Sequence, residues 1–169
     1  MKLPGLIVVC AIAAMPSLAS AQPFFIGGGL GAGVRIDDVN TQFKLEQQFG
    51  YHFSGRPEGF FLGLNAGESF GDGLVLLQIG GRLGWDIEIA RAGEADILLS
   101  PGGVVGIAVF TFDERDAFAR FNWQFTFDIK FRVLRDQLTL FIRAVGLDFF
   151  AGDDFGMRFD FMAGAYLNF

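Results

Sequence analysis

Few side chains in this sequence could carry out chemistry by themselves. His52 is the only histidine, which excludes a histidine-rich metal site, and Cys10 is the only cysteine. The glycines within 27–33 follow a period of two with no helix after them, which excludes a phosphate-binding loop. What remains are charged residues at alternate positions, such as Asp128 and Lys130. Their chemistry would be ion pairing, and the elements that carry them decide where those pairs lie.

The first 21 residues have the features of a secretory signal peptide. Lys2 supplies the positive charge, residues 6–14 form a short apolar stretch, and Ala19-Ser20-Ala21 forms a small-x-small cleavage site. We therefore expect residues 1–21 to be removed and residues 22–169 to form one domain. Because Cys10 leaves with the signal peptide, the mature chain would have neither disulfides nor thiol chemistry.

The mature chain alternates between apolar and polar residues. In residues 121–131, FNWQFTFDIKF, six large apolar side chains share one parity, while amides, a threonine and charges share the other. Side chains of a strand point alternately to its two faces, so this segment predicts a strand with one apolar face. The same pattern recurs along the chain and predicts eight strands. Turn-rich breaks separate them at 37–41, 54–58, 71–73, 90–95, 112–118, 135–136 and 151–154.

Alternation alone does not say which face meets water. A soluble lipocalin-like barrel would turn the apolar row inward, whereas a membrane barrel turns it towards lipid. Of the 24 glycines, 13 lie on the polar parity, where they would make room for charged side chains inside a narrow barrel. No apolar run is long enough for a membrane-spanning helix, although the mean hydropathy is positive. The sequence predicts an all-β fold, an eight-stranded antiparallel up-and-down transmembrane β-barrel.

Aromatic residues lie near the predicted strand ends. Membrane barrels carry such residues as girdles at the two membrane surfaces. We expect Trp123 at one girdle, and Tyr51 and Trp85 at the other. The wider set includes Phe70, Phe110, Phe112, Phe149 and Phe155 with Trp123, and Phe53, Phe60, Phe131 and Phe169 at the opposite rim.

One hairpin allows its register to be predicted. If Arg135-Asp136 is a two-residue turn, Phe131 lies beside Leu140, and Ile129 beside Ile142. The same register places Asp128 opposite Arg143, so that opposite charges meet across the strands.

The end of the chain resembles that of a known family. A signal peptide, eight amphipathic strands and the ending Gly164-x-x-Leu167-x-Phe169 resemble the small outer-membrane β-barrels of Gram-negative bacteria, the OmpA/OmpX-type group. The resemblance implies that Gly164, Leu167 and Phe169 act as an assembly signal. It also implies insertion by the barrel assembly machinery with periplasmic chaperones, and both termini in the periplasm. Met162 departs from the polar residue usual at that position of the signal.

Inward-facing charges are the main candidate site. The predicted lumen network comprises Arg82, Asp86, Asp128, Lys130, Arg132, Arg143, Arg158 and Asp160; Arg35, Lys44, Glu46 and Glu88 also face inward. Charges confined in this way must pair or contact water, because isolated burial is costly. A network that closes the lumen implies a structural role in membrane integrity. The alternative is a narrow porin-like channel for water, ions or small solutes.

Partners follow from the same topology. The breaks that would face the exterior carry eight acidic residues, Asp37, Asp38, Asp72, Asp113, Glu114, Asp116, Asp153 and Asp154, against Arg115. They could hold divalent cations against lipopolysaccharide phosphates, or they could simply be solvated loop tips. Outer-membrane lipid and lipopolysaccharide are the expected surroundings. Without Lys2 the chain has 12 basic residues against 19 acidic residues, which argues against nucleic acid as a partner.

A second alternative is an enzyme. His52-Phe53-Ser54 resembles the His-x-Ser motif of outer-membrane lipid A deacylases, in which histidine acts as the base for a serine nucleophile. Gly55 stands where that family has asparagine, and the motif lies early in the chain. We therefore predict a non-enzymatic protein, with no catalytic residue, no cofactor and no metal site, and keep a lipid A-modifying hydrolase as the alternative.

Overall fold

The computed structural model describes residues 23–36, 41–71, 73–112, 115–152 and 156–169. These segments fold into eight strands: β1 (Phe24–Arg35), β2 (Thr41–His52), β3 (Gly59–Gly71), β4 (Leu74–Ala92), β5 (Ala95–Phe112), β6 (Arg115–Val133), β7 (Leu138–Ala151) and β8 (Gly156–Asn168). The proposed signal peptide lies outside the described residues. Among those residues, no helix is long and apolar enough to span a membrane.

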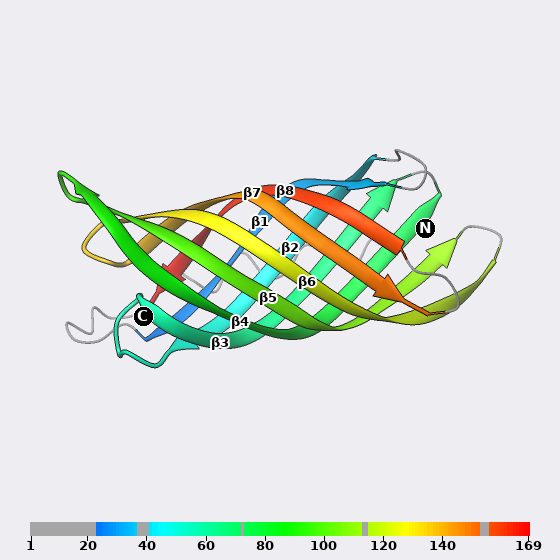
Figure 1. The fold of residues 1–169 in the computed structure, drawn as a ribbon, viewed down its shortest axis with the longest axis horizontal. Helices are drawn as coiled ribbons and strands as arrows, with labels where there is room; N and C mark the ends of the chain where they lie inside the picture. Colours follow the sequence, from blue (N-terminus) through cyan, green and yellow to red (C-terminus); the bar gives the residue numbers. More distant parts are fainter. Residues whose placement is uncertain (1–22, 37–40, 72, 113–114, 153–155) are drawn as a thin grey trace.

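The strands form one closed barrel in sequence order (Figure 1). Every neighbouring pair is antiparallel, and β1 closes the ring against β8. The backbone of Phe24 donates to the carbonyl of Phe169 at 3.0 Å, and Phe169 donates back to Phe24 at 2.9 Å. The all-β, up-and-down barrel is thus confirmed. The end that holds these two residues is called the terminal end below, and the other is called the far end.

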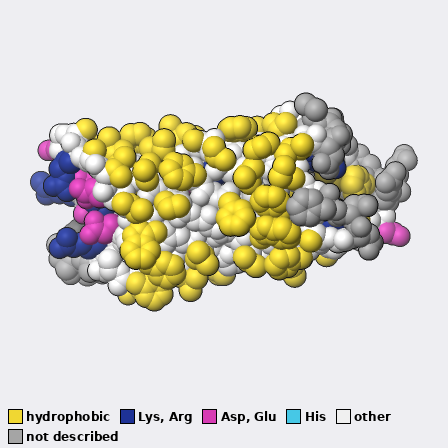
Figure 2. All heavy atoms as spheres, in the orientation of Figure 1, with side chains coloured by type: hydrophobic (Ala, Val, Ile, Leu, Met, Phe, Trp, Pro, Cys, Tyr) yellow, Lys and Arg dark blue, Asp and Glu magenta, His cyan; other side chains and the backbone are white. Residues whose placement is uncertain are grey.

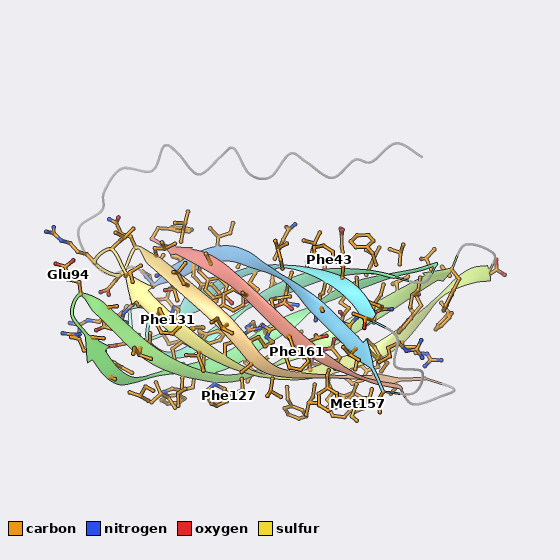
Figure 3. The ribbon with its side chains drawn as sticks, turned by 90° about the horizontal axis from the view of Figure 1, so that it is seen from above. Phe43, Glu94, Phe127, Phe131, Met157 and Phe161 are labelled. Carbon is orange, nitrogen blue, oxygen red and sulfur yellow. The ribbon has the colours of Figure 1, made fainter. Side chains whose placement is uncertain are left out.

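The two faces of the wall have the reverse of the polarity found in water-soluble barrels. Arg82, Arg143 and Arg158 are at most 1% exposed because their strands turn them into the bore. Outward residues such as Ile79 are as much as 67% exposed. Figure 2 shows hydrophobic side chains over the middle of the barrel and charged ones at one end. In Figure 3, Phe43 and Phe127 point away from the wall, and Phe161 is likewise 50% exposed.

The predicted hairpin register is confirmed. Asp128 pairs with Arg143, Ile129 with Ile142 and Phe131 with Leu140. The turn itself follows an uncommon backbone path, since Arg135 and Asp136 both have positive φ values, 53° and 71°. This is the conformation that a two-residue turn needs to match the twist of its strands.

Two predicted breaks are too wide. The break predicted at 90–95 is shorter, because β4 and β5 stay paired as far as Ala92 opposite Ala95. The break predicted at 112–118 is shorter too, because β5 and β6 stay paired as far as Phe112 opposite Arg115. A bulge lies near each of these hairpins, between Glu88 and Ala90 and between Phe110 and Phe112. Backbone pairing continues where the apolar alternation has stopped, so the pattern alone marks the ends of these strands too early.

Candidate functional site

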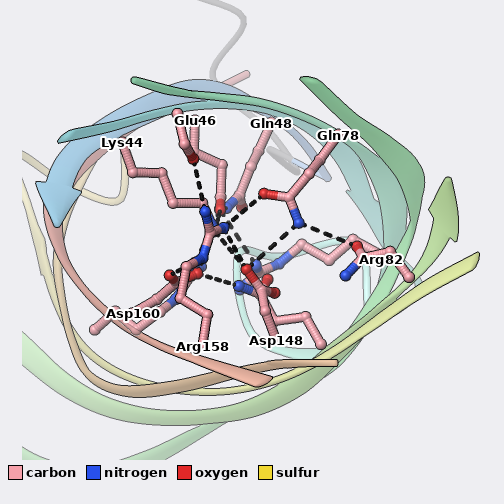
Figure 4. A network of polar contacts seen from close by, with 12 residues as sticks. Lys44, Glu46, Gln48, Gln78, Arg82, Asp148, Arg158 and Asp160 are labelled. Atoms are coloured by element: carbon pink, nitrogen blue, oxygen red, sulfur yellow. Dashed lines mark hydrogen bonds and ion pairs between the residues drawn. The ribbon is translucent and has the colours of Figure 1, made fainter. Parts of the chain in front are cut away.

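The bore of the barrel holds the candidate site. A first ionic layer lies in the half of the bore towards the far end (Figure 4). Arg158 from β8 donates to Asp148 of β7 at 2.5 Å and lies 3.0 Å from Asp160. Lys44 from β2 reaches the same two carboxylates, 3.3 Å from Asp148 and in direct contact with Asp160. All four side chains are buried, so each charge is offset by its neighbours rather than by bulk water.

Amide and hydroxyl groups complete this layer. Arg158 donates to Gln42 and to Ser69 at 2.9 Å, and to Gln78 at 2.8 Å. Gln124 donates to Asp160 at 2.7 Å. These neutral groups come from four different strands, so they tie the wall together across the bore.

The centre of the bore holds a second ionic layer. Arg143 donates to both oxygens of Glu46 at 2.9 and 3.0 Å, and to Asp128 at 2.9 Å. Arg82 donates to the other oxygen of Asp128 at 2.8 Å. The fork of the Arg143 guanidinium matches the Glu46 carboxylate, the strongest common geometry for such a pair.

A third group lies towards the terminal end. Asp86 accepts from Lys130 at 2.8 Å and lies 3.0 Å from Nε2 of His52. The Lys130 ammonium lies over the rings of Phe61, at 4.7 Å, and Tyr166, at 5.3 Å. Cation–π contacts of this kind stabilise a lysine that has left water. Across the three groups, five bases (Lys44, Arg82, Lys130, Arg143, Arg158) face five acids (Glu46, Asp86, Asp128, Asp148, Asp160).

Two apolar clusters also cross the bore. Towards the far end, Leu74, Leu76, Ala108, Phe110 and Phe150 pack together beyond the first ionic layer. Towards the terminal end, Phe25, Phe61, Phe141, Met162 and Tyr166 form the second cluster. The strand registers place the far-half and central ionic layers between the two clusters, at the same depth as the outward apolar wall.

The terminal mouth of the bore carries a separate ion-pair cluster. Arg132 donates to Asp96 at 2.7 Å, to Glu88 at 3.2 Å and to the carbonyl of Pro57 at 3.1 Å. The last contact holds the β2–β3 turn against this mouth. Hydrogen bonds from Arg132 and Arg91 lower the pKa of Asp96 below its ordinary value, although partial burial opposes them.

The structure places all eight predicted network residues in the bore or at its mouth. Each of them makes an ion pair, and Asp128 meets Arg143 as the hairpin register predicts. Asp148 was missed, although it accepts from three side chains. A bulge between Arg143 and Gly146 reverses the parity of β7, so odd residues face inward before it and even residues after it. The alternation in the sequence carries no clear mark of that reversal.

The apolar clusters were also missed, because strict alternation assigns apolar residues to the outer wall. Phe110 was expected in a girdle, yet it is buried in the bore. Its even parity, shared with the inward residue Ala108, was the available signal.

Tyr51, Trp85 and Trp123 lie on the outer wall, whereas Phe112 packs against the far-end apolar cluster and Phe155 lies outside the described residues. Tyr51 and Trp85 belong to a line of ring contacts that runs around the terminal end from β8 to β4, Phe169–Phe24–Tyr51–Phe53–Phe60–Trp85. Near the far end, Trp123 stacks on Phe149 with ring centres 5.4 Å apart. Large rings therefore border the apolar wall at two levels.

The three residues of the expected assembly signal help to close the barrel. Gly164 lies so close to β1 that an added Cβ would be 2.1 Å from the carbonyl oxygen of Gly28. Leu167 pairs with Ile26 of β1 and Leu138 of β7, and Phe169 makes the closing backbone bonds. Closure thus gives each residue a structural role, while recognition by an assembly machine stays a prediction.

The side chains of His52 and Ser54 contact different partners. His52 faces the bore and contacts Asp86. Ser54 lies in the β2–β3 turn, where its hydroxyl is 2.9 Å from the carbonyl of Arg56 and 2.5 Å from that of Glu58. Between these two described residues there is no side-chain hydrogen bond. Within the same described ranges, no cluster of three or more acidic, histidine or cysteine side chains could hold a metal ion.

No protein-family model matches the chain, and no curated protein matches it. Among solved structures, Neisserial surface protein A aligns with 86% of this chain and 97% of its own, with a TM-score of 0.66 and 9% identity. The chain has the fold of the small eight-stranded outer-membrane β-barrels. The outer membrane enzyme PagL aligns with 85% of this chain and 98% of its own, with a TM-score of 0.53 and 9% identity. At such identities the likeness concerns the barrel fold, and the role of this barrel has to be argued from its own bore and wall.

Proposed function

We propose that this chain is an integral outer-membrane protein whose role is structural: a small, closed barrel that supports the integrity of the membrane. Its terminal end would face the periplasm and its far end the exterior. Tyr51 and Trp85 would then lie at the periplasmic surface, and Trp123 near the outer one. Lipid and lipopolysaccharide would cover the wall.

The observation that carries the proposal is the filling of the bore. An ion that crossed it would have to pass two apolar clusters, and hydrophobic constrictions exclude water. Between them it would have to break ion pairs such as Arg143–Glu46 and Arg158–Asp148, whose members are buried and matched in charge. A sealed bore of this kind favours a structural role over a porin-like one.

Conductance in planar lipid bilayers tests this role. The purified, refolded barrel should give no discrete current steps, and liposomes that contain it should not swell in small sugars. Steps that scale with salt concentration would overturn the closed-bore proposal and favour the narrow channel. A refolded porin in the same bilayers serves as the positive control.

The proposed partners follow from this orientation. The Gly164, Leu167 and Phe169 ending would be read by the barrel assembly machinery after delivery by periplasmic chaperones. Divalent cations at the acidic exterior loops remain a proposal on sequence grounds. Of their acidic residues, Asp116 is exposed and belongs to β6, and the rest lie outside the described residues.

A hydrolase is the second candidate, because the outer membrane enzyme PagL has this fold and His52 does contact a carboxylate, Asp86. The proposed structural role predicts that lipid A incubated with the wild-type barrel keeps all of its acyl chains. Release of fatty acid by the wild type, but not by Ser54→Ala, would establish the hydrolase instead.

A further inference from the structure

The outward wall between the two levels of aromatic rings is apolar except at two adjacent places. Within the described strands, the outward side chains there are aliphatic, aromatic or glycine apart from Gln47 on β2 and Glu68 on β3. Both are exposed, and neither has a side-chain partner among the described residues. The pairing of Gln47 with Ala66 and of Leu45 with Glu68 makes them diagonal neighbours.

The depths of the two side chains differ. Gln47 lies midway along β2 between Phe43 and Tyr51, four residues from each, so it would lie near the middle of the apolar layer. Glu68 lies only two residues before Phe70, close to the far-end rings. A carboxylate there can reach water at the membrane surface, whereas an amide at the middle cannot.

The residues beside Gln47 on the neighbouring strands have small side chains. Four residues form one continuous row across neighbouring strands, Ala165 on β8, Gly28 on β1, Gln47 on β2 and Ala66 on β3. Three of them have little or no side chain, so another surface could approach the backbone closely on either side of the amide. Close approach and interchain hydrogen bonds are what hold membrane segments together, since lipid gives them no hydrophobic drive to associate.

We propose that the β8–β1–β2–β3 wall is a dimer interface for a second copy of this chain. Two barrels with the same orientation are related by a two-fold axis along the membrane normal, which keeps every residue at its own depth. With that axis beside Gln47, the side chain meets Gln47 of the partner subunit. An amide both donates and accepts, so the two side chains satisfy each other, which neither lipid nor a purely apolar partner can do.

Glu68 should weaken the association of the two barrels. It lies on the same wall, nearer the outer surface, so the dimer brings two carboxylates towards each other. Their repulsion weakens association, and Glu68→Gln should strengthen it. Gln47→Leu removes the matched amides while keeping a lipid-compatible side chain, and it should weaken association about tenfold.

Cross-linking in native membranes tests the proposal, which rests on the proposed membrane location. Residues 22–169 contain no cysteine, so single cysteines can be placed at will. Leu45→Cys, beside Gln47 on the wall, should give a disulfide-linked dimer on mild oxidation. Val105→Cys, on the outward face of β5 three strands away, is even more exposed than Leu45 but should not. Adding Gln47→Leu should reduce the Leu45→Cys dimer about tenfold, and Ala66→Phe should reduce it by blocking approach, whereas Val105→Phe should not.

The outcomes separate this proposal from the proposed function. Equal cross-linking at the two cysteines, or a dimer unchanged by Gln47→Leu, would overturn the interface while leaving a monomeric membrane barrel intact. Recovery of the wild-type chain in the soluble fraction would instead overturn the membrane location. Heat-modifiable gel mobility checks that each variant is a folded barrel, so loss of the dimer cannot be mistaken for loss of the fold.

Discussion

Asp128 is the residue on which the central ionic layer depends. It accepts from Arg143 at 2.9 Å and from Arg82 at 2.8 Å, and all three side chains are buried. Asp128→Ala would leave two guanidinium groups short of a counter-charge. We expect the free energy of unfolding to fall by about 3–5 kcal/mol, measured by urea titration in detergent micelles.

The exposed Asp116 of the same strand provides a matched control. Asp116→Ala should leave the urea midpoint within error of the wild type, because an exposed carboxylate has no buried charge to offset. A wild-type midpoint for Asp128→Ala would mean that the two arginines are held by water or by Glu46, and that the hairpin ion pair is dispensable.

The contribution of Asp96, at the terminal mouth, to the free energy of unfolding should depend on pH. Its pKa is lowered in the folded barrel, chiefly by the hydrogen bonds from Arg132, so it releases its proton more readily when folded than when unfolded. Its contribution to stability is therefore complete above the pKa of the unfolded side chain, about 4, and is lost as the pH falls through the folded value. The difference in urea midpoint between wild type and Asp96→Asn should be constant above about pH 5 and shrink below about pH 4. A difference that widens in acid would contradict this.

At the scale of the strand, the sequence predicts well wherever alternation is uninterrupted. The Asp128–Arg143 register follows from a parity that is unbroken around the hairpin turn, from Asp128 to Arg143. Beyond Arg143 the β7 bulge reverses parity, so Asp148 could not be placed. Bulges depend on how neighbouring strands pair and twist, which are tertiary properties. Gln47 and Glu68, by contrast, were overlooked although their parity already placed them outward.

Closure of the barrel depends on β8 lying close to β1. The missing side chain of Gly164 permits this, since an added Cβ would be 2.1 Å from the Gly28 carbonyl oxygen and 2.5 Å from the Phe141 ring. Gly164→Val should prevent closure and abolish heat-modifiable mobility. Refolding from urea into detergent measures barrel closure in the absence of any assembly machinery. A failure to refold there cannot be attributed to lost recognition of the assembly signal.

Gly81 on β4 is the matched control for that substitution. It is also a strand glycine, but no atom lies within 4 Å of an added Cβ. Gly81→Val should refold as the wild type does. If Gly164→Val also refolded fully in detergent, its role would lie in recognition rather than in strand packing.

At the scale of the whole molecule, the polarity of each face of the wall follows from what that face contacts. A narrow bore can hold ionic groups only if they pair with each other, and an apolar wall is stable only in a solvent as apolar as itself. The bore meets the first condition with five acids and five bases. The second condition implies a membrane whose thickness matches the wall.

The spacing of the rings predicts that thickness. Tyr51 and Phe43 are eight residues apart on β2, and Phe60 and Phe70 are ten apart on β3. With a rise of about 3.3 Å per residue and a strand tilt of about 40°, the apolar wall is about 20–25 Å high. This is thinner than the hydrocarbon core of a typical bilayer, about 30 Å.

The barrel should therefore be most stable in thin bilayers, because a mismatch must be relieved by deforming lipid or by exposing apolar rings to water. We expect the free energy of unfolding and the refolding yield to be higher in dilauroyl than in dioleoyl phosphatidylcholine vesicles. Urea titration followed by Trp85 and Trp123 fluorescence measures both, since both side chains lie on the lipid-facing wall. Equal stability in the two lipids would mean that the rings do not mark the membrane surfaces, and the depth assigned to Gln47 would then lose its basis.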